Sequence, residues 1–203
     1  MTRGRFIAFE GGEACGKSTQ AALLATALDA VLTREPGGTT IGRSIRSLVL
    51  DPATVGLDAR AEALLMAADR AQHVAEVVEP ALAAGRHVVT DRFAGSSIAY
   101  QGGGRGLPSD EVRRLSEWAT AGVWPDLIVL LEVPAAVADE RLQRDLDRME
   151  AEPRAFHDAV AASFREQAAA EPERWVVVDG TGTVEQVRAA VNAAVGDRLQ
   201  LHT

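Results

Sequence analysis

The chain has 203 residues, of which 47% are hydrophobic and 25% are charged, and its formal net charge is −8. This length and composition predict a single folded domain over residues 1–203 and argue against a disordered chain. The negative balance argues against nucleic acid or an anionic membrane as a partner, so a phosphate site would need a local cluster of arginine and lysine.

Short apolar runs alternate with helical patterns along the whole chain. The runs are rich in Val, Ile and Leu without polar alternation, which is typical of strands covered on both faces. The predicted strands span residues 5–10, 30–33, 87–91, 126–133 and 174–179. Helices are predicted at residues 17–29, 41–50, 58–84, 94–101, 109–121, 134–149, 154–170 and 183–199. The alternation predicts an α/β fold, with a five-stranded parallel sheet and helices on both faces.

Glycines, charges and hydroxyls follow the predicted strands. Ligands of such sheets bind beyond the carboxyl ends of the strands, so these segments are expected to form a polar site. The segments are GGEACGKS, REPGG, RFAGSS and PAAVADER.

The stretch FEGGEACGKST (residues 9–19) fits a phosphate-binding loop between a strand and a helix. Backbone amides of such a loop face the phosphates, Lys17 supplies charge toward the β and γ groups, and the Ser18 hydroxyl can ligate Mg²⁺. We therefore predict a site for ATP and Mg²⁺. The predicted ATP contacts are Gly11, Gly12, Glu13, Ala14, Cys15, Gly16, Lys17, Ser18 and Thr19.

Cys15 is the only cysteine, so we expect neither an internal disulfide nor a cysteine-based zinc site. It is either a small apolar filler or a redox-sensitive thiol at a helix N-terminus. No run of about 18 apolar residues is present, and the N-terminus leads directly into a predicted strand, so neither a membrane span nor a signal peptide is expected. These features together favour a cytoplasmic protein.

Further motifs follow the loop in order along the chain. They are TREPGGT (33–39), IRSLVL (45–50), AEALLMAADRAQH (61–73), DRFAGSSIAYQGGGRG (91–106), PDLIVLLEV (125–133) and LDRMEAE (146–152). With the loop, this ordered set resembles bacterial thymidylate kinases, which are P-loop nucleoside monophosphate kinases, over essentially the whole chain. The resemblance implies a P-loop NTPase fold with a helical lid at about residues 141–153, transfer of phosphate from ATP to dTMP in dTTP synthesis, and a homodimer.

The resemblance also assigns a dTMP site. Its residues are Glu13, Glu35, Pro36, Arg46, Met66, Arg70, Arg92, Ser96, Ser97, Tyr100 and Gln101. Arg46 and Arg92 would bind the acceptor phosphate, and Asp91 would order Mg²⁺ together with Ser18, partly through water. Glu13 would bind the 3′-hydroxyl. An ordinary surface ion pair is the alternative for each arginine.

The thymine contacts implied by the resemblance involve Met66, Arg70 and the segment 96–101. Arg70, the two serines and Gln101 would hydrogen-bond the base, and Tyr100 would crowd the position of a ribose 2′-hydroxyl. The family has an aromatic ring where this chain has Met66, so we expect weaker base stacking here. A core methionine and helix-capping serines are the alternatives.

Phosphoryl transfer requires positive charge around the moving group. Lys17 and Mg²⁺ supply part of it, but Ala14 and Cys15 inside the loop are neutral, so a lid must supply the rest. Arg141, Arg144 and Arg148 are spaced three and four residues apart, which predicts one helical face directed at the triphosphate. A solvated face with a pair between Glu140 and Arg144 is the alternative.

Two other functions stay open from the sequence. One is a kinase for another monophosphate, dUMP or dCMP, which the departure at Met66 makes more credible. The other is a nucleotide-binding regulatory module that has lost phosphoryl transfer, which the short lid suggests.

Overall fold

A central parallel sheet organises the chain, whose computed structural model describes residues 3–142 and 146–201. The strand order is β2-β3-β1-β4-β5, and every neighbouring pair is parallel. The strands are β1 (Phe6–Glu10), β2 (Val31–Arg34), β3 (Val88–Asp91), β4 (Leu127–Glu132) and β5 (Trp175–Asp179). The predicted five-stranded α/β fold is confirmed.

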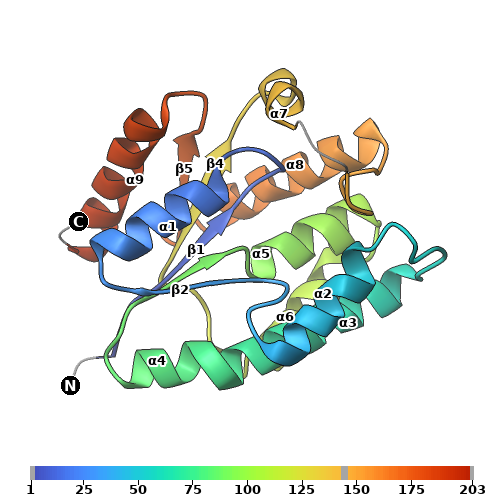
Figure 1. Cartoon of the computed structure of the whole chain (residues 1–203), viewed down its shortest axis with the longest axis horizontal. Helices are drawn as coiled ribbons and strands as arrows, with labels where there is room; N and C mark the ends of the chain where they lie inside the picture. Colours follow the sequence, from blue (N-terminus) through green and yellow to red (C-terminus); the bar gives the residue numbers. More distant parts are fainter. Residues whose placement is uncertain (1–2, 143–145, 202–203) are drawn as a thin grey trace.

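Helices cover both faces of the sheet (Figure 1). The α-helices are α1 (Lys17–Ala27), α2 (Thr40–Leu50), α3 (Ala59–His73), α4 (Glu79–Ala83), α5 (Ala94–Ser97), α6 (Ser109–Ala119), α7 (Ala135–Arg141), α8 (Arg154–Ala170) and α9 (Val184–Leu199). Two π-helical segments, η1 (Val74–Val78) and η2 (Ile98–Gly104), continue α3 and α5. Residues 59–83 thus form the long helical run predicted at 58–84.

Side chains alternate between two cores because successive residues of a strand point to opposite faces. Ile7 and Phe9 pack with α1 and α9, whereas Phe6 and Ala8 pack with η1, η2 and α8. All five residues of β1 are buried. Because helices cover both faces of the sheet, the strands consist of continuous apolar runs in the sequence.

The described residues include no helix that is long and apolar enough to span a membrane.

The helix predicted at residues 134–149 is wrong at its C-terminal end among the described residues, because α7 ends at Arg141 and residues 146–149 are not helical. Asp147 and Glu150 form a reciprocal capping arrangement that starts a separate turn. Asp147 Oδ1 accepts from the backbone N–H of Glu150, and the Glu150 carboxylate accepts from the N–H of Asp147. Arg141 and Arg148 therefore do not share a helical face, and Arg144 lies outside the described residues.

Candidate active site

The phosphate loop joins the carboxyl end of β1 to the N-terminus of α1. Gly11 and Gly16 have φ values of 139° and 95°, which favour glycine. A Cβ on Gly11 would lie 2.4 Å from the carbonyl oxygen of Leu131, so a larger residue would push the loop off the sheet. The loop leads directly into α1, whose first backbone N–H groups are available for an anion.

Lys17 and Cys15 lie close together in this loop. The Lys17 ammonium donates to the carbonyl of Gly12 and lies 3.4 Å from Cys15 Sγ. Cys15 is buried and packs in the core with α1 and β4. This burial favours the apolar-filler interpretation of Cys15.

A pair of oxygen ligands lies beside the loop. Phe9 of β1 is in register with Asp91 of β3, which brings the loop next to the end of β3. The Ser18 hydroxyl donates to Asp91 Oδ2, while Asp91 Oδ1 is buried without a hydrogen-bond partner among the described residues. This unsatisfied carboxylate oxygen and the hydroxyl fit Mg²⁺, which prefers oxygen ligands and keeps waters or phosphates for its other positions.

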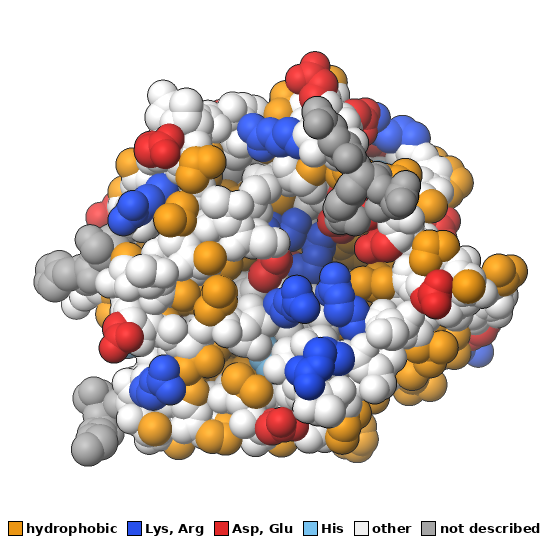
Figure 2. All heavy atoms as spheres, viewed as in Figure 1, with side chains coloured by type: hydrophobic (Ala, Val, Ile, Leu, Met, Phe, Trp, Pro, Cys, Tyr) orange, Lys and Arg blue, Asp and Glu red, His pale blue; other side chains and the backbone are white. Residues whose placement is uncertain are grey.

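A cavity of about 400 Å³ opens in front of the loop. The predicted site residues that line it are Glu13, Ala14, Gly16, Lys17, Ser18, Thr19, Glu35, Pro36, Arg46, Met66, Asp91, Arg92, Ser96, Tyr100, Gln101 and Arg141. Figure 2 shows basic side chains gathered around a hollow in the middle of this face. One cavity therefore joins the predicted ATP loop to most of the predicted dTMP site.

Three arginines meet in this cavity, Arg34, Arg46 and Arg92. Burial lowers the pKa of Arg46, and the positive charges of Arg34 and Arg92 lower it further. Arg46 donates to the carbonyl of Pro36 at 3.0 Å. Since mutual repulsion opposes this arrangement, an anion bound among the three guanidinium groups would relieve it.

Arg92 is held in place by several oxygen atoms. Its Nη1 donates to the Gly11 carbonyl at 2.9 Å and to Ser96 Oγ at 3.0 Å, and its Nη2 donates to Glu13 and to the Tyr100 hydroxyl. The Tyr100 hydroxyl donates to Glu13 at 2.7 Å. Burial alone would lower the pKa of Arg92, but Glu13, Tyr100, Asp91 and Glu10 together more than offset it, and the pKa lies well above its usual value.

Glu10, the last residue of β1, ties the loop strand to Arg92. Its Oε1 accepts from the backbone N–H groups of Phe93 at 3.0 Å and Ser96 at 2.9 Å, and Oε2 accepts from the Ser96 hydroxyl. Burial raises the pKa of Glu10 from 4.5 to about 7. Ser96 therefore donates to Glu10 while accepting from Arg92, which makes it a link between the two.

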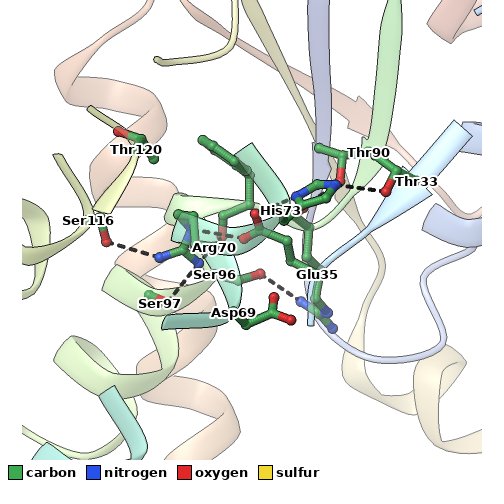
Figure 3. Close-up of polar contacts among 12 residues, drawn as sticks. Thr33, Glu35, Asp69, Arg70, His73, Thr90, Ser96, Ser97, Ser116 and Thr120 are labelled. Carbon is green, nitrogen blue, oxygen red and sulfur yellow. Dashed lines mark hydrogen bonds and ion pairs between the residues drawn. The ribbon is translucent and has the colours of Figure 1, made fainter. Parts of the chain in front are cut away.

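Arg70 lies in a fully buried polar network beneath the cavity (Figure 3). Its Nε donates to Glu35 at 2.8 Å, and its Nη atoms donate to Ser116, Ser97 and the Phe93 carbonyl. His73 Nδ1 is 2.8 Å from the other Glu35 oxygen. Neither Arg70 nor Ser97 is among the described residues that line the cavity, so their contact with the base stays a prediction.

Asp69 holds the loop that precedes α2. Its Oδ1 accepts from the backbone N–H of Gly37 at 2.9 Å, and its Oδ2 is buried without a partner among the described residues. Burial, followed by the nearby Glu35 carboxylate, raises the pKa of Asp69 to about 6. Asp69 thus fixes the segment that contains Glu35 and Pro36.

Arg148 contacts α2 and α3 rather than the phosphate loop. Its Nε donates to the Val49 carbonyl at 2.8 Å, and its Nη2 pairs with buried Glu62. Arg141, in contrast, lines the cavity and donates to the Gly180 carbonyl at 3.1 Å. Of the two described lid arginines, Arg141 is the one that the structure brings to the phosphate loop.

The comparisons with known proteins agree with this geometry. A sequence model of the family described as thymidylate kinase matches residues 9–191. The chain belongs to the thymidylate kinase family.

Individual relatives match over nearly their whole length. A thymidylate kinase of Bifidobacterium longum subsp. infantis is 46% identical over 205 residues, covering 97% of this chain and 88% of the relative. One from Rhizorhabdus wittichii is 48% identical, covering 97% and 99%. The crystal structure of thymidylate kinase from Ehrlichia chaffeensis superimposes with a TM-score of 0.80 at 30% identity, covering 98% of this chain and 100% of that one. The resemblance and the P-loop NTPase fold are confirmed.

Several site residues of this thymidylate kinase family member were not identified from the sequence. They are Glu10, Arg34, Glu62, Asp69, His73, Ser116, Arg105, Asp147, Met149 and Glu150. The helix 59–73 did carry a signal, because Glu62, Asp69 and His73 recur with Met66 and Arg70 at spacings of three and four. Polar residues on the inner face of an alanine-rich helix indicate buried hydrogen bonding.

Glu10 should make stability depend on pH. A carboxyl whose pKa is raised on folding stabilises the protein fully below pH 4.5, and this contribution is lost as the pH rises through about 7. Glu10→Gln cannot ionise, so the free energy of unfolding of this variant relative to wild type should rise between pH 5 and 8, by up to about 3 kcal/mol. Urea denaturation across this pH range measures the difference, and the exposed Glu185→Gln is the matched control. A difference that stays constant or falls with pH would contradict this role for Glu10.

Proposed function

We propose that this chain transfers the γ-phosphoryl group of ATP to dTMP, forming ADP and dTDP in the synthesis of dTTP for DNA replication. The observation that supports this most directly is a cavity that joins the phosphate loop to a cluster of three arginines. The donor triphosphate would occupy the loop side and the acceptor phosphate the arginine side. Membership of the thymidylate kinase family supplies the choice of dTMP.

The donor side needs fixed positive charge and no general base, since the acceptor phosphate oxygen is already ionised. Lys17 and the N-terminal amides of α1 would bind the β and γ phosphates. Ser18 and Asp91 would hold Mg²⁺, which when bound neutralises charge on the phosphates. The chain's own contribution is thus positioning and electrostatic stabilisation.

The acceptor side would bind the dTMP phosphate through Arg92 and Arg46, with Arg34 adding charge. Arg92 is already oriented by Glu13, Tyr100 and Ser96, so little ordering would remain when dTMP binds. Glu13 would also bind the 3′-hydroxyl, and Tyr100 would leave no room for a 2′-hydroxyl.

The base would lie between Met66 and Gln101, which both line the cavity. Arg70 and Ser97 would support this wall or contact the base directly, and Glu35 and Pro36 would shape the side toward α2. The thioether of Met66 can pack on a base, but it is less rigid than an aromatic ring.

We propose that residues 1–203 form a single domain with a lid at about residues 141–153. We assign to Arg141 the positive charge that the lid contributes. Arg148 is already paired with Glu62, whereas Arg141 lines the cavity beside the phosphate loop. Arg144 stays a further candidate. A guanidinium here would stabilise the charge that develops on the transferred group, and a closed lid would exclude water.

A coupled assay of ADP release with ATP and a panel of monophosphates tests the function. ADP release should depend on dTMP and be faster with dTMP than with dUMP or dCMP. ATP without acceptor measures hydrolysis, and Lys17→Ala measures the background. A faster rate with dUMP or dCMP would favour the kinase for that substrate, and nucleotide binding without turnover would favour a regulatory module.

Arg141→Ala should lower kcat about 100-fold or more while changing the KM for dTMP only slightly, because the lost charge acts on the transferred group. Arg165→Ala, an exposed arginine of α8, is the control for loss of a surface charge. Turnover that survives Arg141→Ala but is lost in Arg148→Ala would return the lid role to Arg148.

We also propose a homodimer, in the cytoplasm. Helix α3 packs against α2 and against α6 (Figure 1). Large apolar side chains are exposed on all three helices. They are Ile41, Leu48, Leu64 and Trp118. Exposed apolar side chains on neighbouring helices suit a symmetric interface. Light scattering after size exclusion should give twice the chain mass for wild type and for Val184→Glu on α9, and the single mass for Leu64→Glu. A wild-type monomer at micromolar concentration would rule the dimer out. Cell fractionation tests whether the protein is located in the cytoplasm.

A further inference from the structure

The side-chain amide of Gln101 is held in one orientation. Gln101 is 1% exposed, and its Nε2 donates to Glu62 Oε1 at 2.9 Å. Its Oε1 is buried and has no hydrogen-bond partner among the described residues. Both side chains line the cavity, so the carbonyl half of the amide is the half left for a ligand.

Glu62 can only accept hydrogen bonds. Burial by itself would raise its pKa, but the hydrogen bonds from Gln101, Arg148 and Arg105 more than offset it, so the pKa lies below its usual value. An ionised carboxylate has no proton to donate. A flipped Gln101 amide would place its carbonyl oxygen against this carboxylate, so the observed orientation is the only one that is satisfied.

The Glu62 carboxylate is fixed from several sides. Arg105 donates to both of its oxygens, at 3.2 Å each, and also pairs with Glu152. Arg148 pairs with it while its own backbone N–H donates to the Leu50 carbonyl at 3.0 Å. The partners of Glu62 thus lie in η2, directly after it, and in the turn that precedes α8, which is itself bonded to the end of α2. Glu62 therefore cannot rotate away from Gln101 without breaking two ion pairs.

An unsatisfied buried carbonyl selects the ligand that brings a donor. Thymine and uracil carry an N–H at ring position 3, whereas cytosine has an unprotonated acceptor nitrogen there. Sites built to hydrogen-bond a substrate N–H reject analogues that lack it strongly, because the site's polar group is then left unpaired. The polarity of the Gln101 amide thus decides between these two classes of base.

We propose that Glu62 is a specificity-determining positioning residue, which holds the Gln101 carbonyl toward the base so that pyrimidines with an N3–H are accepted and cytosine is rejected. The inference rests on the proposed function, since it assumes that a pyrimidine monophosphate occupies this cavity. It also gives Arg148 a role distinct from catalysis, as an anchor of Glu62.

The Glu62→Gln variant tests the proposal, because a glutamine at 62 can present either an N–H or a carbonyl to Gln101 and so permits the flipped amide. The ratio of kcat/KM for dCMP to that for dTMP should rise at least tenfold. Glu171→Gln is the matched control: it removes a carboxylate that pairs with Arg113 and is not among the described residues that line the cavity, so the ratio should stay at the wild-type value. If Glu62 had a purely structural role, the variant would lower kcat/KM for dTMP and for dCMP by the same factor and leave the ratio unchanged. This result would overturn the proposal, and so would an equal shift of the ratio in the control.

Two additions keep the result decisive. If Glu62→Gln does not fold, the double variant Glu62→Gln/Arg148→Gln removes a charge of each sign and should give the same shift. If the wild-type chain shows no dTMP-dependent ADP release, the proposed function fails. The ratio of the dissociation constants for dTMP and dCMP, measured by calorimetry in wild type and Glu62→Gln, then tests Glu62 by itself. An unchanged ratio would refute the role of Glu62.

Discussion

The contacts between the phosphate loop and the Asp91–Arg92 turn depend on the parallel pairing of β1 with β3. Phe9 opposite Asp91 places the ends of both strands at one edge of the sheet, so the phosphate loop and the Asp91–Arg92 turn emerge side by side. Glu10 then accepts hydrogen bonds from Phe93 and Ser96 across this junction. A shift of one residue in this register would move Asp91 away from Ser18 and reverse the face of every side chain on β3.

The charged residues in and around the cavity fall into two kinds with different consequences. Arg70 with Glu35, and Arg105 and Arg148 with Glu62, are balanced by carboxylates and hold helices and loops in fixed positions. Arg34, Arg46 and Arg92 meet in the cavity, where burial and the neighbouring positive charges lower the pKa of Arg46 even though Arg92 is paired with Glu13. Balanced pairs shape the walls, and the cluster in which positive charges repel one another is the part suited to an anionic substrate.

Local sequence predicted the elements well because their signals are local. Each predicted strand overlaps its observed strand to within one residue at either end, since apolar runs covered on both faces have no competing interpretation. The helix at 134–149 failed because helical spacing was extended across a motif, Asp147 to Glu150, that caps a new turn. The capping signal is local and present in the sequence, and it takes precedence over the helical spacing of the arginines.

The sequence by itself determined the phosphate loop, the order of strands and helices along the chain, and the family to which the ordered motifs point. These features depend on residues close together in the chain. Only the tertiary structure decided which partner each polar side chain has. Arg148 pairs with Glu62, 86 residues away, and Ser96 links Arg92 to Glu10. Spacing along one helix cannot specify such contacts, because each joins a helix or turn to an element brought beside it by the sheet.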